Sequence, residues 1–381
     1  MFRPQIQKTS TLFFIALFNL LMVYLSVNST VKIKRLGFED KIAAANHMNS
    51  CIDELKQLNP DLSEKDIYET GLLGIKTSEI TTIQDIDNSM LKSKQLTTHP
   101  NFAAYIVELF HESELRDGDT IAVSMTGSFP GANIALFSAC EVMNIKPIVI
   151  SSVGSSSWGA NRIDFSWPFI EQHLYDSKFI KNKSIAYSMG GDNDNGDNLP
   201  DEGIEKIESI IPDNAIFVNN STLRGNIKKK LSIFEQQSNN YSMYVNVGGG
   251  VSSLGMGEDK DTLKVGLINL LDIDDMELNE FKKSVAYQFL NPKNSDDYQN
   301  SIPMLNIKRI TEFVPEDYKI KFFMGNMKIE NGNLFYDYNR YNPVVILLGL
   351  FMSLVIIISI GFYSHLQIKR RMETHEVDSI I

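Results

Sequence analysis

The chain has 381 residues and a formal net charge of -11. A protein with this charge repels a phosphate backbone, so general nucleic-acid binding is excluded as its main function. The length allows one large domain or two small ones. Two cysteines, Cys51 and Cys140, are too few for a disulfide framework, and we interpret both as buried thiols.

Two apolar runs lie near the ends of the chain, at 12–27 and 344–363. A helix that crosses a membrane needs roughly 17–25 apolar residues. The second run meets this length without a charge, whereas the first is slightly short and contains Asn19. A cleaved signal peptide is the alternative for the first run, but no Ala-x-Ala site follows it. We therefore predict a retained membrane helix at each end.

Basic residues beside these runs predict the orientation. Three of them follow the second run at 369–371, and only Arg340 stands just before it. Positive residues stay in the cytoplasm, so both tails are predicted to be cytoplasmic and the part between the helices extracytoplasmic. The basic residues at 32–35 oppose this orientation. The expected location is the cell (inner or plasma) membrane, in a two-pass protein.

Strand and helix patterns alternate in the middle of the chain. Residues 120–125 and 147–152 are typical of strands, and 132–143 between them is typical of a helix, which makes a βαβ unit with a buried parallel sheet. The pattern predicts an α/β fold, a doubly wound and mostly parallel sheet with additional N-terminal helices. Further strands are expected at 184–188, 215–219 and 243–247, and further helices at 39–60, 102–115, 203–211 and 222–236.

These patterns divide the chain into seven predicted segments. They are a cytoplasmic tail at 1–11, a transmembrane helix at 12–28, a helical region at 29–119, an α/β core at 120–257, a cap or stalk at 258–342, a transmembrane helix at 343–363 and a cytoplasmic tail at 364–381.

Four predicted strands end in Gly/Ser-rich turns, TGSFPG, VGSSSWG, MGGDNDNG and VGGGVSSLGMG. The carboxyl ends of parallel strands share one edge of a sheet, so these loops should converge. Glycines let backbone N–H groups approach a ligand, which favours a carboxylate or a phosphate, and an arginine can take a carboxylate with two hydrogen bonds. The candidate ligand-binding residues are Gly127, Ser128, Gly131, Gly154, Ser155, Ser156, Arg162, Gly190, Gly191, Arg224, Gly248, Gly249, Gly250 and Ser252.

Three of the loop serines, Ser128, Ser156 and Ser252, are also candidate nucleophiles. None fits the Gly-x-Ser-x-Gly elbow, no histidine lies in these loops, and nothing in the sequence supports a lysine or aspartate base.

The basic cluster 228–230 is interpreted as a solvated helix face. The acidic turn 192–197 departs from the calcium-loop pattern, and zinc and Walker patterns are lacking, so neither a metal nor a cofactor is expected.

The stretch AVSMTGSFPGANIALFSACEVMNIKPIVISSVGSSSWGAN (122–161) resembles the poly-gamma-glutamate system protein family. The segments SMGGDNDNG and VNVGGGVSSLG are similar to further parts of it, and the resemblance covers most of 37–325. It implies a membrane-associated accessory role in the synthesis or export of poly-gamma-glutamate capsule or slime. The implied partners are the polymer or glutamate oligomers and the synthase and export subunits. No catalytic residues follow from it.

Three hypotheses remain open at this point. The first is an accessory protein that binds the carboxylate-rich polymer through its loops. The second is a hydrolase or transferase that acts on gamma-glutamyl units through a loop serine. The third is a scaffold that holds other subunits through its membrane helices, where Gly349 and Ser353 are four residues apart. A hydrolase requires a base within hydrogen-bond reach of a serine, whereas a binding protein requires only converging donors.

Overall fold

The computed structural model describes residues 6, 8–59, 63–273, 277–291, 301–315, 318, 329 and 332–378. Its contacts divide the chain into two compact units. The small unit consists of 1–35 with 336–381, and the large unit consists of 36–335.

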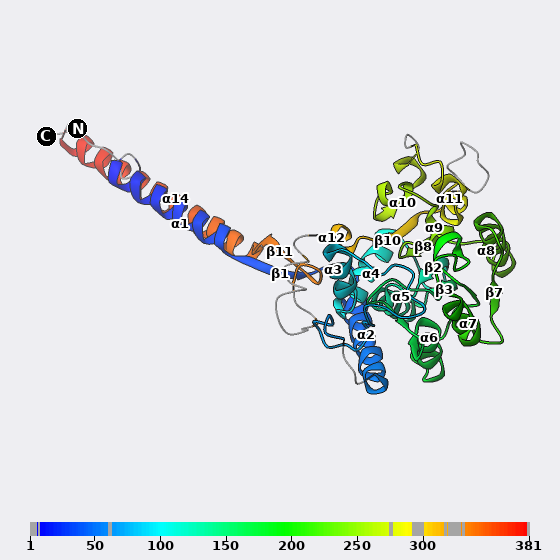
Figure 1. Cartoon of the computed structure of the whole chain (residues 1–381). Coiled ribbons are helices and arrows are strands. Elements are labelled where there is room, and N and C mark those ends of the chain that lie inside the picture. Colours follow the sequence, from blue (N-terminus) through cyan, green and yellow to red (C-terminus); the bar gives the residue numbers. More distant parts are fainter. Residues whose placement is uncertain are drawn as a thin grey trace. The chain divides into compact units, whose positions relative to one another are not determined.

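The small unit contains two long helices and a two-stranded antiparallel ladder (Figure 1). Both helices are long and apolar enough to cross a membrane, and they lie side by side. Residues 30–34, which the sequence places in a helical region, form a strand because they pair with the segment that precedes the second helix. The elements are α1 (Thr9–Asn28), β1 (Thr30–Lys34), β11 (Tyr336–Tyr341) and α14 (Pro343–Asp378).

Polar and small residues in these helices are used within the chain. The amide of Asn19 donates to the carbonyl oxygen of Ile15 at 2.8 Å, so this polar group is satisfied inside its own helix. Gly349 faces α1, where a Cβ on the glycine would lie 3.5 Å from the Cβ of Met22. The small residue at 349 therefore allows the two helices of one chain to approach each other.

The large unit contains a seven-stranded sheet in the order β7-β6-β3-β2-β8-β10-β9. All neighbours are parallel except β9, which runs antiparallel to β10. The predicted α/β class with a mostly parallel sheet is confirmed. The strands are β2 (Thr120–Thr126), β3 (Lys146–Ser152), β6 (Ala186–Ser188), β7 (Ile216–Val218), β8 (Met243–Val247), β9 (Gly266–Ile268) and β10 (Met304–Ile307).

The direction of the strand order reverses beside β2. Successive strands β2, β3, β6 and β7 extend the sheet to one side, and β8 then returns to the other side of β2. In open α/β sheets, ligands bind outside the carboxyl ends of the strands at such a reversal. The loops that follow β2 and β8 are therefore the first place to look for a site.

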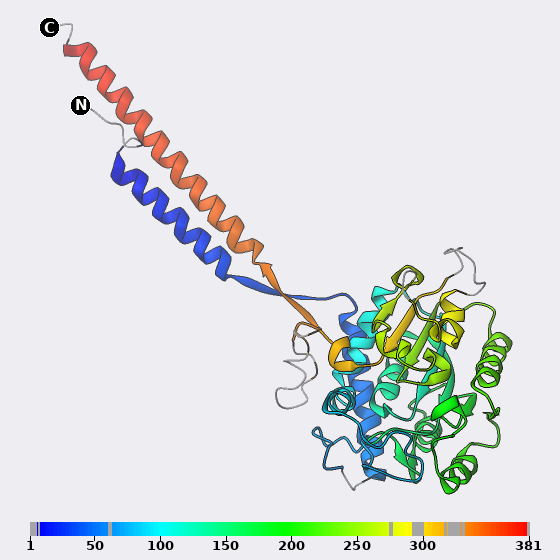
Figure 2. The same cartoon turned by 45° about the horizontal axis from the view of Figure 1, so that its top comes forward.

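Helices lie around this sheet (Figure 2). The helix after β2 begins with Pro130, whose fixed φ suits the first turn, and ends at Asn144 in the left-handed conformation, with φ 51°. The helices are α2 (Phe38–Leu58), α3 (Asn88–Thr97), α4 (Asn101–Glu112), α5 (Pro130–Met143), α6 (Trp167–Asp176), α7 (Asp201–Ile210), α8 (Leu223–Gln237), α9 (Val251–Leu254), α10 (Asp259–Thr262), α11 (Val285–Leu290) and α12 (Ile310–Phe313). Three 3-10 helices at Asp192–Asp194, Leu270–Asp272 and Phe281–Lys283 and the short pair β4 (Asn161–Arg162) and β5 (Phe165–Ser166) complete the description.

The interior confirms the interpretation of both cysteines as buried thiols. Cys51 lies on α2 and Cys140 on α5, and neither forms a disulfide. Burial raises the pKa of the Cys51 thiol to about 12 and also raises that of Cys140, so both stay protonated and unreactive at neutral pH.

A buried acid lies against the sheet on α6. The carboxylate of Glu171 accepts hydrogen bonds from the hydroxyl of Tyr187 and, at 2.9 Å, from the hydroxyl of Ser184. Glu171 is fully buried, and this burial raises its pKa from 4.5 to about 7. The folded protein therefore binds a proton here that the unfolded chain releases at lower pH.

Glu171→Gln is expected to flatten the pH dependence of stability on the acid side. Between pH 4.5 and about 7 the folded state binds more protons than the unfolded state, so stability falls as pH rises through this window. The difference in pKa corresponds to about 3 kcal/mol lost by pH 7. Urea unfolding on either side of this window measures it, with Glu202→Gln on an exposed side chain as the control. An equal loss in the Glu171→Gln variant and the wild type would contradict the prediction.

Candidate functional site

The four Gly/Ser loops lie side by side at the carboxyl edge of the sheet. The loop after β2 contacts the loop after β3, since the N–H of Ala160 donates to the carbonyl oxygen of Gly127 at 2.8 Å. The loop after β3 contacts the loop after β6 in the same way, from Gly154 to Met189 at 2.8 Å. The loop after β8 comes so close to the end of β2 that a Cβ at Gly248, whose φ is +95°, would overlap the side chain of Thr126.

Close packing explains why several of these loop positions are occupied by glycine. A Cβ at Gly127 would lie 2.7 Å from the carbonyl oxygen of Val153, and one at Gly131 would lie 2.6 Å from that of Thr97. These neighbours are backbone atoms, which cannot move aside easily. Gly249 differs, because the nearest atom to its Cβ position is Cε of Lys308 at 3.9 Å. Gly249 is also exposed, so its backbone is the part of these loops that a ligand can approach. It follows β8, beside the reversal of the strand order.

A buried lysine that sequence reasoning missed lies beneath the first two loops. Nζ of Lys94, on α3, donates to the carbonyl oxygen of Ser128 and, at 2.9 Å, to Oγ of Ser156. Lys94 is fully buried, and within the described part of the chain no ion pair joins it to a carboxylate. Burial lowers the pKa of Lys94 to about 7, so a large fraction of this amine is neutral at physiological pH.

A second buried lysine lies beneath the other two loops. Nζ of Lys230, on α8, is 2.6 Å from Oδ2 of Asp194 and 2.8 Å from Oγ of Ser252. The other carboxylate oxygen of Asp194 accepts from the hydroxyl of Ser188 at 2.8 Å. These contacts link the loops after β6 and β8 to α8. Because the ammonium of Lys230 is already paired with a carboxylate, it differs chemically from that of Lys94.

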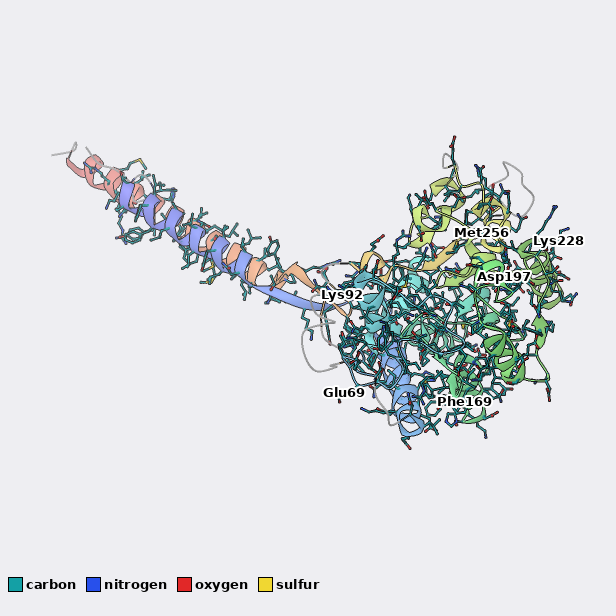
Figure 3. All side chains as sticks on the ribbon, viewed as in Figure 1. Glu69, Lys92, Phe169, Asp197, Lys228 and Met256 are labelled. Carbon is teal, nitrogen blue, oxygen red and sulfur yellow. The ribbon has the colours of Figure 1, made fainter. Side chains whose placement is uncertain are left out.

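The interpretation of the basic cluster 228–230 as a solvated face is wrong for its last member. Lys228 and Lys229 are exposed, and Figure 3 shows Lys228 at the surface of the large unit. Lys230 is only 4% exposed. Consecutive helical residues are rotated by about 100° from each other, and on α8 this rotation turns Lys230 toward the interior while Lys228 and Lys229 face solvent.

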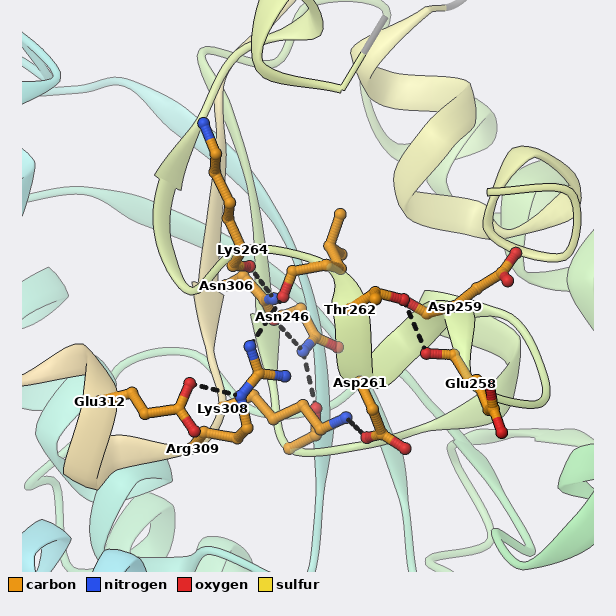
Figure 4. A network of polar contacts seen from close by, with 12 residues as sticks. Asn246, Glu258, Asp259, Asp261, Thr262, Lys264, Asn306, Lys308, Arg309 and Glu312 are labelled. Atoms are coloured by element: carbon orange, nitrogen blue, oxygen red, sulfur yellow. Dashed lines mark hydrogen bonds and ion pairs between the residues drawn. The ribbon is translucent and has the colours of Figure 1, made fainter. Parts of the chain in front are cut away.

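A third lysine, Lys308, follows β10, and Figure 4 shows its side chain beside Asp261. Its Cε lies 3.9 Å from the position that a Cβ would take at Gly249. Nζ of Lys308 is 2.5 Å from Oδ1 of Asp261, whose side chain is 62% exposed, while that of Lys308 is 10% exposed. The neighbouring Arg309 pairs with Glu312 at 2.8 Å. An exposed carboxylate thus covers a mostly buried cation at the carboxyl edge of the sheet.

The two predicted arginines lie in different settings. Arg162 pairs with the carboxylate of Asp164 at 2.7 Å and donates to Oδ1 of Asn59 at 2.9 Å, so it already binds a carboxylate of its own chain. Arg162 also lowers the pKa of Asp164 through its hydrogen bond. Arg224 is exposed in the first turn of α8. Their role toward a ligand stays a prediction.

Two of the three candidate serines contact a lysine. Ser156 meets Lys94 and Ser252 meets Lys230, whereas the hydroxyl of Ser128 accepts the backbone N–H of Ser156 at 3.0 Å. Sequence reasoning found no support for such a base, because the partners are 62 and 22 residues apart in the chain.

The remaining candidate residues lie in the same loops. Ser155 is fully buried, and its hydroxyl donates to the carbonyl oxygen of Ser156 at 3.1 Å. Gly190 and Gly191 have φ of +80° and +70°, a region that favours glycine, and Gly250 follows the open Gly249. Among the described residues, no group of three or more His, Cys, Asp or Glu side chains is arranged to hold a metal ion.

Comparison of the chain with protein-family models found no match, and comparisons with curated proteins and with solved structures found none either.

Proposed function

We propose that this chain is a membrane-anchored accessory protein of poly-gamma-glutamate synthesis or export, and that its large unit binds the carboxylate-rich polymer. The observation that supports the proposal is the gathering of three lysines, Lys94, Lys230 and Lys308, along the edge where the four Gly/Ser loops meet. A chain with a net charge of -11 needs a local cation to receive a polyanion, and of these three lysines Lys308 is the one whose carboxylate partner is exposed.

Lys308 is the cation best placed for a first polymer carboxylate. It lies beside the open backbone of Gly249 at the reversal of the strand order, and its present partner Asp261 is exposed. A glutamate side chain and an aspartate side chain offer the same carboxylate, so a polymer carboxylate can replace Asp261 without leaving Lys308 unpaired. This exchange avoids the cost of an unpaired buried charge.

The remaining parts of the proposal concern the architecture and the membrane. The sheet is proposed to be doubly wound, with α5, α6 and α7 on one face and α8 on the other, which right-handed parallel connections would require. The chain is proposed to span the cell membrane twice, with the large unit outside and the basic end of α14 in the cytoplasm. The large unit would then meet the polymer as it leaves the cell.

Lys308→Gln is expected to weaken binding of short gamma-glutamyl oligomers about tenfold, which corresponds to roughly 1.4 kcal/mol. The measurement is fluorescence anisotropy of a labelled oligomer with the full chain in detergent micelles, at low and high salt. Lys146→Gln is the matched control, because Lys146 is an exposed lysine at the opposite end of the same sheet, on β3. The absence of any binding at low salt, or an equal loss in the control, would sink the proposal.

A further inference from the structure

Two serine–lysine contacts lie at the carboxyl edge of the sheet, and they differ in one respect. Lys230 contacts Ser252, but its Nζ is also paired with the carboxylate of Asp194 at 2.6 Å. Lys94 contacts Ser156, and its other hydrogen bond goes to a neutral carbonyl oxygen. Only an amine with a free lone pair can take a proton from a serine, so of these two contacts the one at Lys94 suits nucleophilic catalysis.

The surroundings of Ser156 hold it in a defined geometry. Its hydroxyl is 2.9 Å from Nζ of Lys94, and its backbone N–H donates to Oγ of Ser128 at 3.0 Å. Ser128 precedes α5 at the strand-to-helix turn after β2, where the positive end of a 14-residue helix favours developing negative charge. Ser156 is 3% exposed and Lys94 is fully buried, so both side chains of the pair are shielded from bulk water.

We propose that Ser156 and Lys94 form a catalytic pair for acyl transfer, with Ser156 as nucleophile and Lys94 as general base. The substrate class is an amide whose acyl group carries a carboxylate, such as a gamma-glutamyl amide; this substrate assignment rests on the proposed function. A neutral fraction of Lys94 at physiological pH, which its burial produces, supports the assignment of the base. Carboxylate groups along the substrate would be held by the cations of the same edge, Lys308 first.

The reaction balances without any further reagent. Lys94 takes the proton of the Ser156 hydroxyl as Oγ attacks the amide carbon, and a tetrahedral intermediate forms. The C–N bond then breaks, Lys94 gives its proton to the departing nitrogen, and the acyl group remains on Ser156 as an ester. Water, or the amine of another glutamate, attacks this ester. Lys94 takes the proton of the attacking group and returns it to Oγ as the ester C–O bond breaks.

A fluorophosphonate probe tests the pair in the full chain in detergent micelles. The expected result is phosphonylation of Ser156, located by peptide mass spectrometry, and release of the amine from a chromogenic gamma-glutamyl anilide. Ser156→Ala abolishes both, and Lys94→Met lowers the labelling rate by roughly a hundredfold, the lower end of what a general base contributes. Ser209→Ala is the control, because Ser209 is an exposed serine on α7 outside the four loops, and it is expected to leave labelling unchanged.

Binding and catalysis are separated by measuring oligomer anisotropy on the same samples. Ser156→Ala is expected to bind the oligomer as the wild type does, since it removes one hydroxyl and no charge. Labelling of Ser156 without oligomer binding would overturn the polymer as substrate and leave the catalytic pair standing. Oligomer binding with no labelling of Ser156, or with labelling that Lys94→Met does not slow, would overturn the catalytic pair. Tryptophan fluorescence confirms that each variant is folded.

Discussion

Lys230→Met is expected to lower the stability of the large unit by about 3–5 kcal/mol, the range found when one partner of a buried ion pair is removed. The side chains of Lys230 and Asp194 are 5% and 3% exposed, so the carboxylate left behind has little access to water. The same change frees the hydroxyl of Ser252 from its donor. Since these contacts link two strand-end loops to α8, the loss should affect the whole sheet edge.

Urea unfolding followed by tryptophan fluorescence measures this loss, because both tryptophans, Trp158 and Trp167, lie in the large unit. Lys228→Met on the same helix is the control, since Lys228 is exposed and should change stability by less than about 0.5 kcal/mol. Adding Asp194→Asn to Lys230→Met removes the stranded charge and should restore part of the stability. Equal effects of the two lysine substitutions would contradict a buried pair.

The sequence predicted the fold where its patterns were long. The five predicted strands, at 120–125, 147–152, 184–188, 215–219 and 243–247, all contain an observed strand, because buried parallel strands are apolar runs bounded by turn residues. The strands β9 and β10 were missed. They lie in a region without regular periodicity, and their pairing depends on neighbours that are distant in sequence.

The sequence predicted that the four loops meet at one edge of the sheet, but it did not predict the lysines that lie there. Parallel strands bring their ends together, so the convergence of the loops followed from topology alone. The positions of the three lysines could not be predicted from topology, because the burial of a charged residue depends on tertiary packing. Lys94 is typical of this: its sequence neighbours are polar, and its partner Ser156 is 62 residues away. The binding role of the glycines stays a prediction, and close contacts with the backbone of Val153 and of Thr97 already require glycine at 127 and 131.

Lys94→Met is expected to stabilise the protein at neutral pH and below, although it removes the proposed base. The pKa of Lys94 is about 7 in the folded protein and 10.5 by its ordinary value, so the unfolded state binds more protons between these limits. Stability therefore rises with pH through this window, and below pH 7 the full cost of burying the amine remains, on the order of 5 kcal/mol.

Two opposing effects decide the size of this gain. Methionine fills a similar volume without a charge, but it leaves the Ser128 carbonyl and the Ser156 hydroxyl without their donor, at a cost of about 1–3 kcal/mol. The expected net gain near pH 6 is about 2–4 kcal/mol, shrinking and then reversing as pH approaches 10. Urea unfolding across this range measures it. A variant less stable than the wild type by the same amount at every pH would assign Lys94 a purely structural role. A pH-dependent gain on removing Lys94 would show that its buried amine is held at a cost in stability, as is common for residues of a functional site.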